Sequence, residues 1–297
     1  MGKLSVPAMR ARKASRGVGA PLVMVTAYDA PEARTADAAG VDLLLVGASV
    51  AMVVLGRQDT LSVTVEEIAH HTRAVRRASP EAVVVADLPW LSYHLSPEDT
   101  VRNAAVLVRA GAQAVKLEGG AKRSLMVEAL VDAEIPVMGH VGLTPQSMHA
   151  MGGFRVQAKT ADGARALVTD ALALEAAGAF SVVLEGVPDV VGRMLTEALT
   201  VPTIGIGAGP WCDGQVLVYH DVLGLEDRVV PTFVRRYADL KAAGVEALAR
   251  FATDVRTGRF PDAAESYHLK PEEAAALGLD PNTGDSASSE AAVSFYG

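Results

Sequence analysis

The chain lacks the features that mark several common classes of protein. Cys212 is the single cysteine among 297 residues, which excludes an intrachain disulfide and gives no cysteine spacing for a metal site. No apolar stretch approaches the roughly 20 residues that a membrane-spanning helix needs. The basic amino terminus lacks the apolar segment of a secretory signal. We therefore expect a soluble, cytoplasmic protein without a membrane partner.

Positive charge is also scarce. The chain has 27 Lys and Arg residues against 35 Asp and Glu residues, which gives a formal net charge of −8. A general nucleic-acid-binding protein needs a cationic surface to displace counterions from phosphates, so we expect no nucleic-acid partner. The one basic cluster, at residues 70–77, is better explained as a solvated helix face than as a phosphate site.

Apolar sequence is abundant, at 50% of the residues, and it is arranged in short runs. The runs are VMVTAYD at 23–29, LLLVGAS at 43–49, VVVADLP at 83–89, AVKLEGG at 114–120, PVMGHVG at 136–142, VVLEGVP at 182–188, TIGIGAG at 203–209 and GQVLVYHDVLG at 214–224. Continuous apolar runs with little alternation are typical of parallel strands buried on both faces. Eight strands, each expected to be followed by a helix, predict an α/β fold of the (β/α)8 or TIM-barrel type rather than an open doubly wound sheet.

Helix signals lie between and after these runs. Thr64 and Glu67 form a Thr-x-x-Glu capping box ahead of a helix to about residue 78, and Ser96 followed by Pro97 starts another helix. Residues 160–177 and 232–258 also have helix-compatible spacing. We expect one barrel domain with C-terminal helices over residues 1–280, followed by a disordered tail over residues 281–297.

A polar side chain or a glycine lies at or near the carboxyl ends of six of these strands. These residues are Ser49, Asp87, Lys116, Glu118, His140, Glu185 and Gly207. The carboxyl ends of parallel barrel strands meet on one rim, where the active sites of such barrels form. We therefore expect an active site built from this set.

The charged members of the set allow more than one chemistry. Asp87 and Glu118 could hold one Mg²⁺, which prefers carboxylate oxygens, or they could order the rim loops by hydrogen bonds. Lys116 falls two residues before Glu118, so strand alternation points both side chains to the same face. There it could bind a substrate carboxylate or form a Schiff base.

Two further candidates each have a structural alternative. Glu185 ends an apolar strand, where desolvation would raise its pKa toward that of a useful general base. A salt-bridged glutamate is the alternative, and the context favours catalysis. His140, as a lone histidine, is better explained as a packed, hydrogen-bonded group than as a catalyst.

Nine segments of the chain together resemble one family. They are TAYD at 26–29, VG-x-S at 46–49, HTRAVRR at 71–77, ADLPW with SY at 86–93, GAQAVKLEGG at 111–120, GHVGLTPQS with GGFRVQ at 139–157, ALALEAAGAF at 171–180, VLEGVP at 183–188 and IGIGAG with DGQVLV at 204–218. In this order, over residues 4–268, they closely resemble the ketopantoate hydroxymethyltransferase family. The resemblance implies a (β/α)8 barrel related to the phosphoenolpyruvate mutase and isocitrate lyase superfamily, and a homo-oligomer, often a decamer.

The resemblance also implies a reaction and roles for the rim residues. Members transfer a hydroxymethyl group from 5,10-methylenetetrahydrofolate to 3-methyl-2-oxobutanoate, using Mg²⁺, and so make the pantothenate precursor 2-dehydropantoate. Asp87 matches a direct Mg²⁺ ligand that also lies against the 2-oxo acid, and Glu118 matches a carboxylate of the metal shell. Ser49 and Lys116 match substrate contacts, and Glu185 matches the acceptor of the C3 proton. His140 matches a position near the substrate, where we expect an orienting role.

One departure from the family pattern concerns the metal. Where the family reads VGDS, this chain reads VGAS, so Ala48 stands in place of a second metal-ligating aspartate. Alanine cannot coordinate a cation, so we expect Mg²⁺ binding to be weakened or absent. Smaller departures are Ala30, where an aromatic residue is usual, and Ala51, where glycine is common. Two alternatives follow: an aldolase-type enzyme that acts on another 2-oxo acid with little or no metal, or a barrel that binds a keto acid without turnover.

Overall fold

The computed structural model describes residues 5–14, 20–78, 81–226 and 231–279. Contacts within the chain divide it into two compact units, Met1–Asp239 and Leu240–Gly297. The tail expected at residues 281–297 lies outside the described residues. The assignment of residues 1–280 to one domain stays a prediction.

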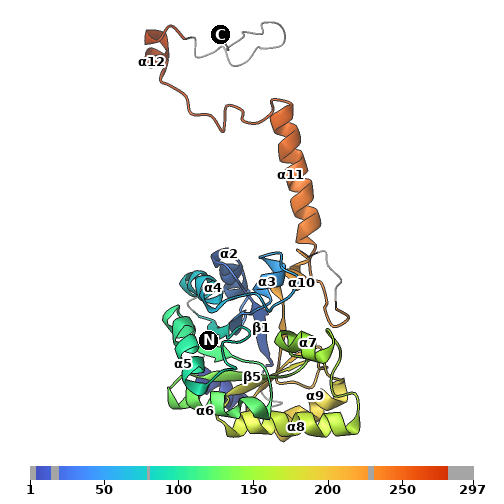
Figure 1. The fold of residues 1–297 in the computed structure, drawn as a ribbon. Coiled ribbons are helices and arrows are strands. Elements are labelled where there is room, and N and C mark those ends of the chain that lie inside the picture. The colour runs from blue at the N-terminus through green and yellow to red at the C-terminus, as the bar shows by residue number, and fades with distance from the viewer. Residues whose placement is uncertain (1–4, 15–19, 79–80, 227–230, 280–297) are drawn as a thin grey trace. The chain divides into compact units, whose positions relative to one another are not determined.

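The first unit is a closed barrel of eight parallel strands in which neighbours in the barrel are also neighbours in the chain (Figure 1). The strands are β1 Leu22–Thr26, β2 Leu43–Val46, β3 Val83–Asp87, β4 Ala114–Lys116, β5 Val137–Gly142, β6 Ser181–Glu185, β7 Thr203–Ile206 and β8 Gly214–Leu217. The pairing of β8 with β1, in which Leu22 lies opposite Gly214, closes the barrel. The predicted TIM barrel is confirmed.

Helices surround the wall of the barrel or lie at its two ends (Figure 1). They are α1 Val6–Ala14, α2 Ala30–Ala38, α3 Val50–Val53, α4 Val65–Ala78, α5 Pro97–Arg109, α6 Ser124–Asp132, α7 Met148–Met151, α8 Ala161–Ala176, α9 Asp189–Ala198 and α10 Tyr219–Leu223. At the start of α4, Thr64 Oγ1 accepts from the Glu67 N–H at 3.2 Å, and Glu67 Oε2 accepts from the Thr64 N–H at 2.9 Å. These two bonds confirm the predicted capping box. Ser96 caps α5 by accepting from the Asp99 N–H.

The expectation of a helix after every strand is wrong at one place. Residues 207–213 join β7 to β8 without a helix. Within this loop Trp211 is 44% exposed. On β1, which pairs with β8, Val23 is 50% exposed. The outer wall of the barrel therefore has little cover near β8.

Every strand except β5 ends before its run of sequence does, and neighbouring contacts explain two of these ends. β1 stops at Thr26 because Asp29 caps α2, where its side chain accepts from the Glu32 N–H at 2.8 Å. β8 stops at Leu217 because the chain turns into α10, whose Tyr219 N–H donates to Thr26 Oγ1 at 3.0 Å. Both changes bring the end of β1 and the start of α10 together.

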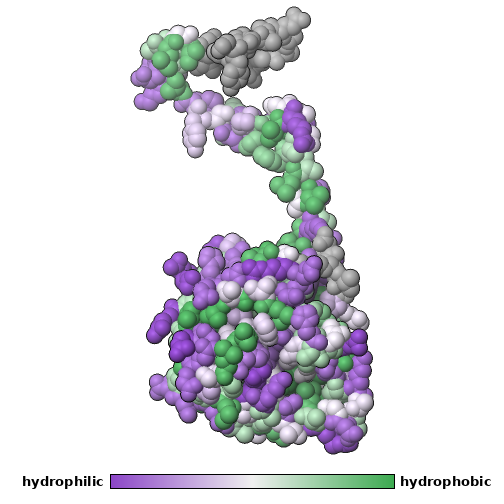
Figure 2. Space-filling model, in the orientation of Figure 1, coloured by the Kyte–Doolittle hydropathy of each residue, from purple (hydrophilic) through white to green (hydrophobic). Residues whose placement is uncertain are grey.

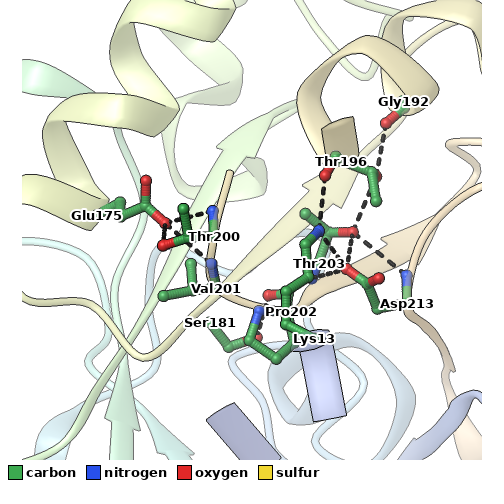
Figure 3. A network of polar contacts seen from close by, with 10 residues as sticks. All are labelled: Lys13, Glu175, Ser181, Gly192, Thr196, Thr200, Val201, Pro202, Thr203 and Asp213. Atoms are coloured by element: carbon green, nitrogen blue, oxygen red, sulfur yellow. Dashed lines mark hydrogen bonds and ion pairs between the residues drawn. The ribbon is translucent and has the colours of Figure 1, made fainter. Parts of the chain in front are cut away.

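A helix and a polar network lie at the amino-terminal end of the barrel (Figure 3). Met9 of α1 is fully buried and belongs to the same apolar cluster as inward residues of the strands. Lys13 Nζ donates to the Thr196 carbonyl at 2.6 Å and to Asp213 Oδ2 at 2.8 Å. Asp213 Oδ2 also accepts from the N–H of Thr203, the first residue of β7, at 2.9 Å. The helix and the network close the amino-terminal end of the barrel, so a site can form only at the carboxyl end.

The second unit contains α11, Leu240–Arg256, and α12, Pro271–Ala276. The helix predicted over residues 232–258 begins later than expected. Before it, the Tyr237 N–H donates to the Val222 carbonyl at 2.8 Å, which holds that residue outside a helix. No residue of α11 is buried. Among the described residues, no helix is both long and apolar enough to cross a bilayer.

Candidate active site

A cavity of about 110 Å³ lies at the carboxyl ends of the barrel strands. Its lining includes Ala48 and all but one of the predicted rim residues, namely Ser49, Asp87, Lys116, Glu118, His140 and Glu185. These residues lie near, at or just after the carboxyl ends of five consecutive strands, β2 to β6. Gly207 is the exception: it does not line the cavity, and a Cβ at this position would lie 2.6 Å from Phe233 Cδ1.

A buried ion pair lies in this cavity. Asp87 ends β3, and the strand register places it opposite Lys116 of β4. Lys116 Nζ lies 2.8 Å from Asp87 Oδ1, and both residues are 3% exposed. Burial alone would lower the pKa of Lys116, but the attraction of Asp87, Glu118 and Glu185 outweighs it and raises that pKa. Lys116 is therefore a fixed cation, which favours ligand binding over Schiff-base chemistry.

His140 links the lysine to the two glutamates. Lys116 Nζ lies 3.3 Å from His140 Nδ1, and an ammonium group has only donors, so Nδ1 accepts this hydrogen bond. Burial, reinforced by the charge of Lys116, lowers the pKa of His140 to about 4. The neutral imidazole then carries its proton on Nε2, which faces Glu185 Oε2 at 3.3 Å. His140 Nδ1 also lies 3.6 Å from Glu118 Oε1.

Both glutamates are poised to change charge near neutral pH. Burial raises the pKa of Glu185 to about 7 and that of Glu118 to about 7, against the opposing attraction of Lys116. Glu118 is further held by the Gln146 N–H, which donates to its Oε2 at 2.9 Å. Glu185 retains 15% side-chain exposure. A carboxylate with this pKa can take a proton from a bound ligand at neutral pH.

A glycine allows the backbone of β6 to approach the loop after β5. Gly142 has a φ of +95°, and a Cβ at this position would lie 2.3 Å from the Glu185 carbonyl oxygen. The next residue, Leu143, donates its N–H to that same oxygen at 2.7 Å. The close approach fixes the backbone from which the Glu185 side chain enters the cavity.

The rest of the cavity lining was not predicted from the sequence. Hydroxyl groups come from Thr26 and Thr60, and an apolar wall comes from Leu45, Val183, Ile206, Val216, Leu217 and Val218. A signal for part of this wall was present. Val183 lies two residues before Glu185 in β6, and residues two apart in a strand share a face.

The residues present fit a loosely held hard cation. Asp87 Oδ1 is buried and pairs with Lys116 Nζ at 2.8 Å, so a cation at this oxygen would share it with the ammonium group, whereas Asp87 Oδ2 accepts from the Ala48 N–H at 2.8 Å. Ala48 itself supplies no ligand. Within the described part of the chain, no group of three or more His, Cys, Asp or Glu side chains is placed to hold an ion. Mg²⁺ tolerates a site with one or two carboxylates when water and substrate complete its coordination.

Comparison with known proteins identifies the family. The model of the ketopantoate hydroxymethyltransferase family matches residues 3–263. A protein of Pyrobaculum islandicum is 56% identical over 247 residues, which cover 83% of this chain and 94% of the relative. A protein of Koribacter versatilis is 51% identical over 263 residues, which cover 88% of this chain and 89% of the relative. Both relatives are named 3-methyl-2-oxobutanoate hydroxymethyltransferase.

Solved structures share the fold at low sequence identity. Phosphoenolpyruvate phosphomutase from Streptomyces platensis subsp. rosaceus is 16% identical with a TM-score of 0.57, and the match covers 92% of this chain and 94% of that one. A 2,3-dimethylmalate lyase, described as a PEP mutase/isocitrate lyase superfamily member, is 18% identical with a TM-score of 0.54 and covers 92% and 94%. These likenesses confirm the predicted type of barrel. The sequence match over most of the chain goes further, and it shows that this protein belongs to the ketopantoate hydroxymethyltransferase family.

Proposed function

We propose that the protein transfers a hydroxymethyl group from 5,10-methylenetetrahydrofolate to 3-methyl-2-oxobutanoate and so makes 2-dehydropantoate for pantothenate synthesis. The observation that carries the proposal is the shared cavity of Glu185, a carboxylate with a pKa raised to about 7 by burial, and Lys116, a buried cation. Removing a proton beside a carbonyl group needs a base together with positive charge for the oxygen that becomes negative.

Each step can be assigned to groups in the cavity. The Glu185 carboxylate takes the C3 proton of the acid, the C–H electron pair forms the C2–C3 double bond, and the carbonyl pair moves onto oxygen. Lys116 and the Ser49 hydroxyl supply donors for the oxygens of the ligand. C3 then forms a bond to the methylene carbon of the folate, both C–N bonds of that carbon break, the two nitrogens take up protons, and water supplies the hydroxyl group. With one water, the products are 2-dehydropantoate and tetrahydrofolate. His140, with Nε2–H facing Glu185, orients the base.

We propose that the protein binds a magnesium ion, but only weakly. Asp87 would hold it directly through Oδ1, with Glu118 nearby in the metal shell, and the ion would polarise the keto oxygen. Ala48 supplies no second carboxylate, so the cation would be held mainly by one side chain, water and the acid. The Lys116 ammonium already neutralises Asp87 without any metal.

That ion pair is the observation that favours a second candidate. An aldolase-type enzyme that acts on another 2-oxo acid with little or no metal would use Glu185 as base and Lys116 as its positive charge. Tetrahydrofolate derivatives separate the two candidates. A rise in the melting temperature with folate supports the first, and a rise with 2-oxo acids alone supports the second. A barrel that only binds a keto acid has no chemical need for the buried base.

We also propose a cytoplasmic homo-oligomer, and the family resemblance implies a decamer. Figure 2 shows apolar side chains along α11. They are Leu240, Val245, Leu248, Phe251 and Val255, with exposures of 43%, 61%, 68%, 51% and 47%. An exposed apolar stripe of this kind on a helix is typical of a contact surface between chains.

The test is exchange of the C3 proton of 3-methyl-2-oxobutanoate in D₂O, followed by NMR with and without Mg²⁺. We expect exchange by the unmodified protein and its loss in Glu185→Gln, which keeps the shape but removes the base. Addition of methylenetetrahydrofolate should convert the acid to 2-dehydropantoate. Exchange that survives in Glu185→Gln would overturn the assignment of the base, and no exchange under any condition would overturn the proposed function.

A further inference from the structure

Tyr28 follows β1, and its backbone N–H, its carbonyl and its hydroxyl group each have a polar partner. Its N–H donates to Glu32 Oε2 at 2.8 Å. Its carbonyl lies 2.6 Å from His71 Nδ1 and can only accept, so the imidazole carries a proton on Nδ1. Its hydroxyl lies 2.7 Å from Ser49 Oγ. With 1% of its surface exposed, Tyr28 has little room to turn.

The partner of the Tyr28 hydroxyl faces the cavity. Ser49 precedes α3 in the capping position, but its side chain makes no capping hydrogen bond. Ser49 also lines the cavity that contains Lys116 and Glu185. Its hydroxyl therefore lies between the Tyr28 hydroxyl and the cavity.

Neighbouring contacts favour one direction for the hydrogen bond between Tyr28 and Ser49. The Tyr219 N–H, which can only donate, donates to Thr26 Oγ1 at 3.0 Å. The Thr26 hydroxyl keeps its own proton for a further bond, and its side chain interacts with the Tyr28 hydroxyl. Burial raises the pKa of Tyr28 far above its ordinary value, so its hydroxyl keeps its proton. These contacts are consistent with a chain of donors that runs from Tyr219 through Thr26 and Tyr28 to Ser49.

We propose that Tyr28 is a positioning residue, whose hydroxyl donates to Ser49 Oγ and thereby commits the Ser49 proton to an acceptor oxygen in the cavity. Lys116 Nζ is also a donor, so the cavity offers donors from two sides. A carboxylate or keto oxygen satisfies them, and a group that must itself donate does not. The inference rests on the proposed function, because it takes the 2-oxo acid to be the ligand.

The experiment is a double-mutant cycle on binding of 3-methyl-2-oxobutanoate, measured by calorimetry with the full chain. The variants are Tyr28→Phe, Ser49→Ala and the two combined. We expect Tyr28→Phe to raise the dissociation constant by about 3- to 10-fold, the effect of one hydrogen bond. In the Ser49→Ala background the same change should have no further effect, because the hydroxyl that Tyr28 positions is gone.

A matched control removes another buried hydroxyl. Thr72, in α4, is fully buried and donates to the Ile68 carbonyl at 2.7 Å, away from the cavity lining. Thr72→Val should lower stability without changing the dissociation constant. If Tyr28→Phe does not fold, 3-fluorotyrosine at residue 28 keeps the shape and strengthens the donor, so the acid should bind more tightly.

The outcomes separate the two proposals. If the unmodified protein fails to bind the acid, the proposed function fails. If it binds and Tyr28→Phe binds equally well, the positioning role alone is wrong. An equal loss from Tyr28→Phe with and without Ser49 also overturns it, because a merely structural effect would not depend on that hydroxyl.

Discussion

Lys116 and Asp87 form an ion pair of 2.8 Å across neighbouring strands β4 and β3, with only 4% and 5% of their side chains exposed. Burial of either charge alone would be costly, because little water reaches it. The pair thus gives the cavity a fixed cation and a neutralised carboxylate in the absence of ligand. It follows directly from strand register, since residues 87 and 116 lie opposite each other.

We predict that Lys116→Met destabilises the protein more than removal of both charges does. The single change leaves Asp87 buried and unpaired, at a cost of about 3–5 kcal/mol. The double variant Lys116→Met with Asp87→Leu should recover most of this loss. Urea unfolding at pH 8 measures both. If the single variant proves as stable as the double variant, another group must neutralise Asp87.

Ala48 permits a direct test of the metal site. In Ala48→Asp a second carboxylate enters the cavity beside Asp87, so Mg²⁺ should bind at least about 10-fold more tightly, as expected for a cation that prefers carboxylate oxygens. Proton exchange at C3 should also become more dependent on Mg²⁺. Ala48→Asn is the matched control, since it adds similar bulk without charge. Equal Mg²⁺ affinity in the Asp and Asn variants, measured by calorimetry, would show that residue 48 does not face the ion.

The pH dependence of proton exchange tests the role of Glu185. Burial raises the pKa of Glu185 to about 7, so the basic form accumulates as pH rises through that value. The exchange rate should increase from pH 5 and level off above pH 8. With a pKa of about 7, the rate at pH 5 should be about 100-fold lower than the rate at the plateau. Glu118 has a similar pKa, so Glu118→Gln is the control. That variant should keep the rise if Glu185 is the base and lose it if Glu118 is.

The sequence predicted the barrel and the rim because both follow from local patterns. Asp87, Lys116 and Glu185 end buried apolar strands, and the carboxyl ends of parallel strands meet on one rim. The capping box at Thr64 and Glu67 was readable because both partners lie within one turn. These features need no knowledge of contacts between distant segments.

The rest of the site depends on contacts that no local pattern encodes. Tyr28 reaches Ser49 and His71 across segments far apart in the chain. His71 belongs to a basic cluster that was predicted to be a solvated helix face, yet its Nδ1–H binds the Tyr28 carbonyl. The late start of α11 also depends on a contact between separate segments, because the Tyr237 N–H donates to the Val222 carbonyl.

The apolar stripe of α11 provides a prediction about assembly. Leu248 and Phe251 are 68% and 51% exposed, and a charge at either position should weaken contact with another chain. We expect Leu248→Asp to lower the molecular mass measured by light scattering. Thr253→Asp, on the opposite face of the same helix, should leave that mass unchanged. If both variants keep the mass of the unmodified protein, α11 does not mediate assembly.

Glu32 gives the protein a pH-dependent stability. Burial raises its pKa to about 7, against the opposing effect of the Tyr28 N–H bond, whereas the ordinary value is 4.5. Between these two values the folded state holds a proton that the unfolded state has lost, so this residue lowers stability as pH rises from about 4.5 to about 7. Glu32→Gln removes the charge and keeps an oxygen for the Tyr28 N–H.

The variant should therefore be more stable than the unmodified protein at pH 8, by at most about 3 kcal/mol, and the gain should shrink toward pH 4.5. Urea unfolding at a series of pH values measures the difference. Glu66→Gln, at an exposed position of α4, is the control and should show no such dependence. A gain of equal size at pH 5 and pH 8 would mean that the amide packs better than the acid, and that the charge of Glu32 is not what lowers stability.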